Sequence, residues 1–576
     1  MMKHKKSIYG ENLISNTKLH LIVIIVVSLL LRLYKFRQGE VFVSSDEVYL
    51  FEYSLKPVYG IFSGNISEAI TQMFRFFNFG WGWGTISFGA LNVFLLSILE
   101  ISINEFTINL PYVFVGTLSV VALYFLCWTI TKDKTAAFIS SMFLAILPAH
   151  VAMSRSIGVT GISSLFLLFL TLICFLRYFI TDEEERRKSG KRNLIAGMLL
   201  LGMYFGTDNQ FPAIILVILC GGMIFCREKK MYGRIINVIG AFLNRYTPLF
   251  FIVNIPVIAG TLYLFSKDML ASSYLNLFHS KKISLNFYAV DLIKALYDNA
   301  GPVLAAILMI SVAYNIYYVI SKKEKYEART FLLLWFIITA FPWLFLVSPK
   351  EVWFQIYILQ PMVCMIVLCS LMFVDILNAT SKESTFLSIN PANAIMLSIM
   401  LPISFFTLAS TSNLVYGSDH LGWEFSPIFG QVGVNTGIKS SGYYARENLP
   451  VNSTIFTDAE VFNARYYFGR KFNILGELDV SGEQILRSYD ELKKNDDISY
   501  IFLEVKNYDL FEKTLSEDNF SKILVFDEEG HEKGALFSKQ IENHAKKAYP
   551  RMDIRKIDPL FDEKYGTIDQ IYIDFG

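Results

Sequence analysis

Two adjacent carboxylates, Asp46 and Glu47, stand in the segment VSSDEVYL that follows the first long apolar run of the chain. An ionised carboxylate can take a proton from a hydroxyl group, so it is a suitable general base for attack by a hydroxyl. Neighbouring side chains diverge by about 180° in a strand or 100° in a helix. One carboxylate would therefore be the base and the other a ligand or structural partner. The plain alternative is an exposed helix start, where acidic residues are favoured.

Cations elsewhere in the chain could stabilise a leaving anion, such as the phosphate released when a phosphosugar reacts. Arg155 follows the third apolar run, and Lys350 lies between two later runs. A loop over 267–299 carries His279 and Lys282. Arg155 could bind an anion or anchor the chain at the membrane surface. Lys350 could do the first of these or simply belong to a turn between two spans.

The run after Lys350 contains two aromatic side chains, Trp353 and Tyr357. They are candidates for donor or acceptor contacts, together with His279 and Lys282. The alternative is an aromatic belt at the membrane surface. The six cysteines all fall in apolar runs, and their spacing matches no zinc site. They are expected to be packing residues, and no metal site follows from them.

The composition shows what kind of molecule must position these groups. Apolar residues make up 53% of the 576 residues and charged residues only 18%, below the roughly 25% of soluble domains. A secreted disulfide scaffold, a nucleic-acid binder and a disordered chain are all disfavoured. The chain therefore has the composition of a membrane protein with many spans.

Apolar runs of the length that crosses a bilayer, about 20 residues, predict eleven spans. They cover 19–36, 110–130, 135–152, 157–180, 192–208, 210–226, 245–266, 300–320, 330–348, 352–374 and 394–414. A further apolar segment, 82–101, begins rich in glycine. We interpret it as lying in or on the outer leaflet, inside an external loop over 37–109.

Orientation follows from lysine and arginine, which favour the cytoplasmic side. They gather at the N-terminus and in the loops at 181–193, 227–234 and 321–329. Eleven spans put all of these inside together with the N-terminus. Arg32, Lys35 and Arg37, at the outer end of the first span, count against this orientation. The nearby Glu40, Asp46 and Glu47 could partner them.

The C-terminal part differs from the rest in charge and pattern. Residues 417–576 hold 28 acidic and 19 basic residues, a net charge of −9, which leaves +10 for residues 1–416. Expected helices and strands alternate from residue 436 to residue 540, which is typical of a small α/β sheet. No glycine-rich phosphate loop follows a strand, so nucleotide binding is unsupported. We expect a membrane domain over 1–416 and a soluble extracytoplasmic domain over 417–576 that serves as a spacer or docks the acceptor.

At these residues the chain resembles the GT-C glycosyltransferases, most closely the protein O-mannosyltransferase and aminoarabinose transferase branch. The similar segments are LLLRLYKFRQGEVFVSSDEVYL, INLPYVFVGTLSVVALYFLCWTITKDKTAAFISSMFLAILPAHVAMSRS, SPKEVWFQIYILQP and GIKSSGYYARENLPVNSTIFTDAEVFNARYYFGR. The second segment also resembles the catalytic subunit of oligosaccharyltransferase, whose corresponding loop faces outward. The resemblance covers most of 19–470, and the order and spacing of the motifs are more specific than any one of them.

The chain departs from this pattern at three places. Asn109 stands where family members often carry arginine, and Val159 to Gly161 replace an acidic residue that often follows SR. The segment FNFGWGWGTISFG replaces a common His-Pro-Pro. These departures concern the donor type and any metal site.

The resemblance implies a mostly α fold, a GT-C helical bundle in the membrane with about 11 spans and a C-terminal extracytoplasmic α/β domain. It implies an inverting glycosyltransferase that moves a sugar from a polyprenyl-phosphate donor to a hydroxyl acceptor on the outer face. Asp46 would be the base, Glu47 would hold the acceptor or the loop, and Arg155 and Lys350 would bind the donor phosphate.

The resemblance also implies the partners. These are a polyprenyl-phosphate-linked sugar, the lipid bilayer and a protein, lipid or glycan acceptor, with no nucleic acid. No cofactor is required, because the donor is already activated; a divalent cation could bind at Asp46 and Glu47. The expected location is the plasma membrane, with the N-terminus cytoplasmic. The alternatives are an oligosaccharide ligase or polymerase, and a non-enzymatic transporter or inactive scaffold, although no repeat typical of transporters is evident.

Overall fold

The structure is a computed structural model, and it describes most of the chain. The described residues are 17–34, 36, 45–67, 83–101, 103, 105–155, 160–181, 190–207, 211–226, 231–255, 289–321, 327–345, 358–381, 401–411, 438–459, 461–469, 471–476, 483–494, 497–504, 507–528 and 531–539.

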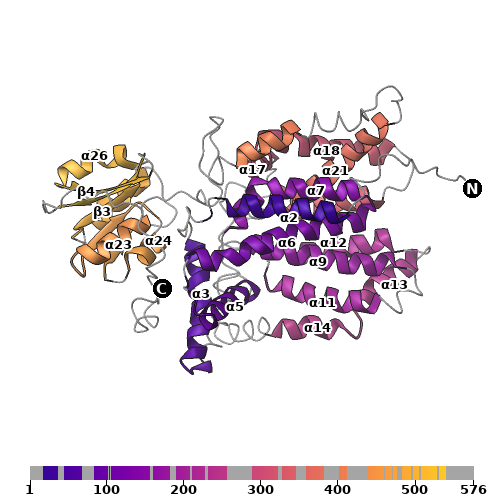
Figure 1. Cartoon of the computed structure of the whole chain (residues 1–576), viewed down its shortest axis with the longest axis horizontal. Coiled ribbons are helices and arrows are strands. Elements are labelled where there is room, and N and C mark those ends of the chain that lie inside the picture. The colour runs from indigo at the N-terminus through magenta and orange to yellow at the C-terminus, as the bar shows by residue number, and fades with distance from the viewer. Residues whose placement is uncertain are drawn as a thin grey trace, which may run out of the picture.

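Long helices lie side by side and form a bundle (Figure 1). Its helices are α2 (Thr17–Leu33), α6 (Glu105–Thr131), α7 (Lys134–Ile146), α9 (Thr160–Ile180), α11 (Lys191–Phe205), α12 (Phe211–Phe225), α13 (Met231–Phe242), α14 (Thr247–Val253), α18 (Pro302–Ser321), α19 (Glu327–Phe345) and α21 (Leu359–Ser381). A shorter apolar helix covers Leu401–Thr411. Their sequences are rich in leucine, isoleucine and phenylalanine, which suits helices that are apolar on most sides.

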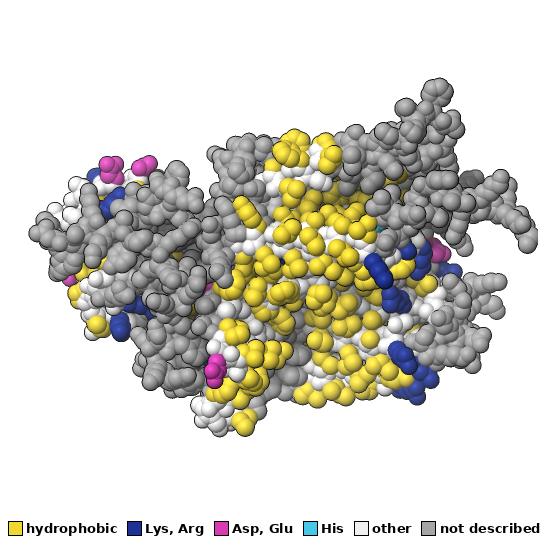
Figure 2. Space-filling view, viewed as in Figure 1, with side chains coloured by type: hydrophobic (Ala, Val, Ile, Leu, Met, Phe, Trp, Pro, Cys, Tyr) yellow, Lys and Arg dark blue, Asp and Glu magenta, His cyan; other side chains and the backbone are white. Residues whose placement is uncertain are grey.

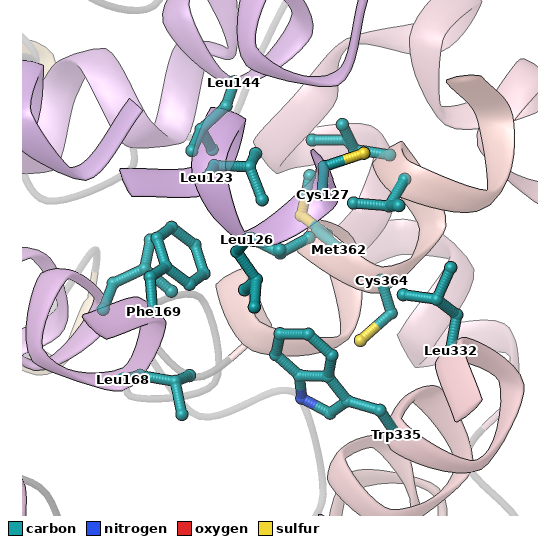
Figure 3. Packing of buried hydrophobic residues seen from close by; sticks show 14 of the residues in the cluster. Leu123, Leu126, Cys127, Leu144, Leu168, Phe169, Leu332, Trp335, Met362 and Cys364 are labelled. Atoms are coloured by element: carbon teal, nitrogen blue, oxygen red, sulfur yellow. The ribbon is translucent and has the colours of Figure 1, made fainter. Parts of the chain in front are cut away.

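The bundle has a buried apolar core in its middle (Figure 3). Four fully buried side chains from four helices converge there: Leu126 of α6, Phe169 of α9, Trp335 of α19 and Met362 of α21. The outward-facing sides of the helices are also apolar over a broad area (Figure 2). Five helices within the described residues are long and apolar enough to cross a membrane. The protein is therefore a multi-pass membrane protein.

A short helix continues one of these helices after a break. α7 is capped at its start by the Asp133 carboxylate, which accepts hydrogen bonds from two backbone N–H groups. It ends at Ile146 because Pro148 lacks an N–H and disfavours a helical residue before it. Leu147 is extended (φ −61°, ψ 120°), and α8 (Pro148–Met153) begins at the proline.

Three helices lie at one end of the bundle. They are α3 (Ser45–Phe62), α5 (Trp83–Ile98) and α17 (Ala289–Ala300). α3 runs across this end, roughly at right angles to the long helices, and packs against α5 (Figure 1).

A small α/β domain lies beyond α3 (Figure 1). Its helices are α23 (Ile438–Asn448), α24 (Val461–Phe468), α25 (Glu483–Leu492) and α26 (Tyr508–Glu517). Its strands are β1 (Thr454–Thr457), β2 (Asn473–Leu475), β3 (Tyr500–Glu504), β4 (Ser521–Glu528) and β5 (His531–Ser538). The strand order is β2-β1-β3-β5-β4, with β1 parallel to β2 and β3, and β5 antiparallel to β3 and β4.

The fold class expected from the sequence is confirmed: a mostly helical, polytopic bundle with a small C-terminal sheet. Each predicted span overlaps a described helix, and the helices and strands of the tail follow the predicted order. The prediction for 245–266 was wrong at its start, because the candidate span begins at Gly233. The sequence did not indicate this earlier start, because the polar residues Arg234, Asn237 and Asn244 interrupt the apolar run. All six cysteines are free.

Candidate active site

The carboxylate pair lies at the start of α3. α3 begins at Ser45, so Asp46 and Glu47 are in its first turn, where acidic residues favour the helix dipole. Their side chains lie outside the described part of the structure. Their backbone lies on a helix that crosses the end of the bundle beside the α/β domain (Figure 1).

Arg155 lies directly after α8 and is 2% exposed. Its Nη1 donates a hydrogen bond of 2.7 Å to the backbone carbonyl of Tyr34, and its guanidinium lies 5.3 Å from the centre of the Phe36 ring. Tyr34 and Phe36 belong to the chain that leaves α2 for α3. The cation is therefore held against the segment that leads to Asp46.

Arg32, in the last turn of α2, is fully buried. Its Nη1 donates hydrogen bonds to the hydroxyl of Ser28 (2.7 Å) and to the Ser28 carbonyl (2.9 Å). Its Nη2 bonds to Nδ1 of His150 on α8. Arg32 thus lies inside the bundle, where it joins α2 to α8.

The imidazole of His150 joins three helices. Arginine only donates hydrogen bonds, so Nδ1 of His150 accepts the bond from Arg32, and the ring proton belongs on Nε2. Nε2 lies 2.8 Å from the Ser119 hydroxyl of α6, and that hydroxyl donates to the Gly116 carbonyl (2.7 Å). A neutral imidazole with its proton on Nε2 can form both of its hydrogen bonds, to Arg32 and to Ser119.

Gly116 allows the close approach of these groups. A Cβ at this position would lie 2.2 Å from Cβ of Ser154 and 3.1 Å from Nε of Arg32. The missing side chain therefore makes room for the junction between α2, α6 and α8. We call the set Ser28, Arg32, Gly116, Ser119 and His150 the arginine–histidine junction.

A buried carboxylate, Asp298, lies near the same end of the bundle. It is 7% exposed on α17, which packs against α8 and α18. Burial raises the pKa of its carboxyl group, and the opposing effect of Lys294 is smaller. α17 ends at Ala300, and a Cβ on the next residue, Gly301, would lie 2.3 Å from the Ser410 hydroxyl. Nothing in the sequence distinguished Asp298 from other acidic residues of amphipathic helices.

The other predicted site residues lie outside the described residues. They are Lys350, His279, Lys282, Trp353 and Tyr357. The structure thus describes the surroundings of Arg155 and the backbone of the carboxylate pair. The roles of all eight predicted residues stay predictions.

The described residues contain no group of three or more His, Cys, Asp or Glu side chains that could hold a metal ion. The search does not include the Asp46 and Glu47 side chains. Two carboxylates are hard oxygen ligands that suit magnesium or manganese. The expectation that a divalent cation could bind there stays open.

Part of the helical bundle matches a family of known proteins by sequence. Residues 95–228 match the family model of dolichyl-phosphate-mannose-protein mannosyltransferase. The matched segment runs from the end of α5 to the residues after α12 and includes the arginine–histidine junction except for the part on α2. No curated protein matches the chain by sequence.

Solved structures of an archaeal oligosaccharyltransferase share the fold. The apo form from Archaeoglobus fulgidus superposes with a TM-score of 0.52 at 11% identity, covering 93% of this chain and 75% of that chain. AglB from the same organism, in complex with an inhibitory peptide and a dolichol-phosphate, has a TM-score of 0.51 at 11% identity, covering 90% and 74%. At such identities the likeness shows the fold alone.

ArnT from Cupriavidus metallidurans, in the apo state, has a TM-score of 0.48 at 10% identity and covers 90% of this chain and 98% of that chain. The resemblance to GT-C membrane glycosyltransferases is confirmed by the family match and by the shared fold.

Proposed function

On the premise of a GT-C bundle whose residues 95–228 match the mannosyltransferase family model, we propose that the protein is an inverting glycosyltransferase. It moves a sugar from a polyprenyl-phosphate donor to a hydroxyl acceptor at the outer face of the membrane. One observation carries the proposal. α3, whose first turn holds Asp46 and Glu47, crosses one end of the bundle (Figure 1), and Arg155 is held against the chain that leads to this helix.

In the proposed reaction, Asp46 takes the proton of the acceptor hydroxyl as that oxygen attacks the anomeric carbon. A new carbon–oxygen bond forms on one side of the carbon, and the bond to the phosphate oxygen breaks on the other. The configuration inverts, and the electron pair leaves with the polyprenyl phosphate. Glu47 holds the acceptor or the loop.

The leaving phosphate gains negative charge, which nearby cations stabilise. Arg155 and Lys350 are assigned this role. A guanidinium offers five N–H donors in a planar fork, a shape that matches the oxygens of a phosphate; in Arg155, Nη1 donates to the Tyr34 carbonyl. The aromatic side chains of Trp353 and Tyr357, with His279 and Lys282, are assigned to donor or acceptor contacts.

The donor already carries its leaving group, so the reaction requires no cofactor. A divalent cation, if one binds at Asp46 and Glu47, would add positive charge beside the reacting groups. The chain's own residues perform each step above without it.

The proposed location is the plasma membrane, with the α/β domain outside and the N-terminus in the cytoplasm. Lysine and arginine side chains gather on the bundle at the end away from the α/β domain (Figure 2), and Lys191 and Arg192 begin α11 there. This distribution supports the orientation through the positive-inside rule. A cysteine at Val451, which is 62% exposed, should react with an impermeant maleimide added to intact cells. Reaction only after the membrane is opened would contradict the orientation.

An oligosaccharide ligase is the second candidate. It is favoured by the shared fold with an archaeal oligosaccharyltransferase, whose complex holds a dolichol-phosphate and an inhibitory peptide. The two functions differ in the donor, which is a single sugar in one and an oligosaccharide in the other.

The test uses the full chain reconstituted in vesicles with radiolabelled polyprenyl-phosphate sugars and polyprenyl-linked oligosaccharides. The proposal expects release of polyprenyl phosphate and transfer of one sugar with inverted configuration. Transfer of oligosaccharides alone would select the ligase. Solute flux without transfer from any donor would select the transporter.

A further inference from the structure

A second hydrophobic cluster, separate from the core in the middle of the bundle, joins the α/β domain to α3, α5 and the start of α6. Buried side chains on the bundle side come from α3, α5 and α6, and those on the other side come from α23, α24 and the sheet. The bundle side comprises Leu50, Phe51, Leu55, Val58, Ala90, Val93, Ile103, Ile108 and Tyr112. A tethered accessory domain would have a polar surface here. The domain is instead packed onto the helix that begins with the carboxylate pair (Figure 1).

A buried hydrogen bond crosses this interface. The hydroxyl of Tyr467 on α24 donates to Oε1 of Glu105, the first residue of α6, at 3.0 Å. Tyr467 is 0% exposed and Glu105 is 1% exposed. A hydrogen bond to a buried carboxylate is among the stronger ones, and losing one partner costs more than the bond itself contributes.

The neighbouring tyrosine contacts α3 directly. The ring of Tyr466 packs edge-on against Phe51, with ring centres 6.1 Å apart. Phe51 lies four residues after Glu47, which is about one helical turn. A displacement of α24 would therefore reach the first turn of α3 through a single contact.

The tyrosine pair is itself held rigidly. A Cβ on Gly442 of α23 would lie 2.4 Å from the Tyr467 carbonyl oxygen, so the two helices touch through their backbones. Arg446 donates through Nη2 to the Tyr466 carbonyl at 2.7 Å. Gly469, with φ +81°, ends this helix beside the same arginine.

We propose that the α/β domain braces α3, with Tyr466 and Tyr467 as positioning residues that hold Asp46 in its working geometry. The inference rests on the proposed function for its effect on turnover. A shift of about 1 Å at a reacting group can lower a rate a hundredfold, so a brace acts on the chemical step and hardly on donor affinity. The expected signature is a loss in kcat with an unchanged donor KM.

The test compares Tyr467→Phe with Tyr489→Phe in the full chain. The control removes a similar bond in the same domain, because the Tyr489 hydroxyl donates to Oδ2 of Asp518 at 2.7 Å, away from the bundle. We expect Tyr467→Phe to lower kcat about tenfold, with donor KM changed less than twofold. Tyr489→Phe should leave both within twofold.

A double-mutant cycle separates the bond from general damage. Glu105→Gln keeps an acceptor oxygen for Tyr467 and should stay within threefold of the wild-type kcat, about half a decade. Glu105→Leu should cost as much as Tyr467→Phe, and the double variant should cost little more than either. Fully additive losses would overturn the coupling.

Hydrogen exchange supplies a readout that does not depend on turnover. We expect the amides of 50–58 in α3 to exchange about tenfold faster in Tyr467→Phe than in Tyr489→Phe, with α9 unchanged. Equal exchange in the two variants would overturn the brace even if no donor is turned over. Faster exchange with unchanged kcat in an active protein would overturn the positioning role, and an inactive wild type would count against the proposed function alone.

Discussion

Arg32 Nη2 bonds to Nδ1 of His150, although the two residues stand 118 positions apart in the chain. A second hydrogen bond links the same two regions. Arg155, five residues after His150, donates to the backbone carbonyl of Tyr34, two residues after Arg32. The end of α2 and the region of α8 are thus joined twice, once by an arginine of α2 and once by an arginine that follows α8. The chain that leaves this joint leads into α3, which carries Asp46, the proposed base, and the joint itself includes Arg155, the proposed phosphate-binding cation.

Replacing Gly116 tests how tightly this joint is packed. In Gly116→Ala the new methyl group would lie 2.2 Å from Cβ of Ser154, so one of the helices must move. Overpacking of this kind costs about 1–3 kcal/mol, and we expect a thermal midpoint in detergent several degrees below wild type. Gly240→Ala is the matched control, because a Cβ there has no atom within 4 Å. Equal midpoints for the two variants would show that the joint is loose.

Arg155→Gln removes the guanidinium that is assigned to the donor phosphate. Losing a charge-assisted contact that acts on the leaving group should lower kcat/KM for the donor about a hundredfold. Phe36→Leu removes the ring beside Arg155 but keeps the cation, and its loss should stay below fivefold, about 1 kcal/mol. Steady-state kinetics decide the matter. A lower thermal midpoint with unchanged kcat/KM would make Arg155 a structural residue only.

The ion pair between Arg329 and Asp375, at the opposite end of the bundle, should contribute to stability but not to sugar transfer. Arg329 Nη2 lies 2.5 Å from Oδ2 of Asp375, and Tyr314 donates to the same oxygen at 2.9 Å. Asp375→Asn leaves a buried guanidinium without its carboxylate and should cost about 3 kcal/mol. Unfolding in detergent measures this, and kcat should stay within twofold of wild type.

A double variant distinguishes a pair from two separate residues. Arg329→Met combined with Asp375→Leu removes both charges and should recover most of the stability that Asp375→Asn loses. A double variant that is less stable than Asp375→Asn would contradict this account of the pair.

Asp298 should make stability depend on pH. Burial raises the pKa of its carboxyl group above the ordinary 3.8, so the folded protein holds the proton more tightly than the unfolded chain does. The resulting stability is fully present below 3.8 and is lost as pH rises through the folded pKa. Asp298→Asn mimics the protonated group and should raise the thermal midpoint at pH 7. The difference should shrink as the pH falls toward 4, and a lower midpoint for Asp298→Asn at pH 7 would contradict the sign.

The long helices and the tail were predictable because each depends on local pattern. Apolar runs of spanning length predicted the bundle, and the short apolar run SYIFLEV predicted a strand over 499–505, observed as Tyr500–Glu504. The error at 245–266 arose where polar residues interrupt an apolar helix, since α13 contains Arg234 and Asn237.

The contacts that assemble the site were not predictable, because they join distant parts of the chain. Tyr467 and Glu105 stand 362 positions apart, and neither local sequence indicates that the two residues are in contact. Arg32 had one local signal, since Ser28 lies four residues earlier on the same face of α2. That spacing suggests a charge turned into the bundle, but it does not identify His150.

The most direct test of the central claim is sugar transfer by Asp46→Asn beside Asp291→Asn, a partly exposed acidic residue of α17. Both variants would be reconstituted with a labelled polyprenyl-phosphate sugar, and donor binding would be measured separately. The account predicts that Asp46→Asn binds the donor normally but transfers at least about a thousandfold more slowly, since it lacks the base, while Asp291→Asn transfers like wild type. Transfer by Asp46→Asn at the wild-type rate would contradict the account.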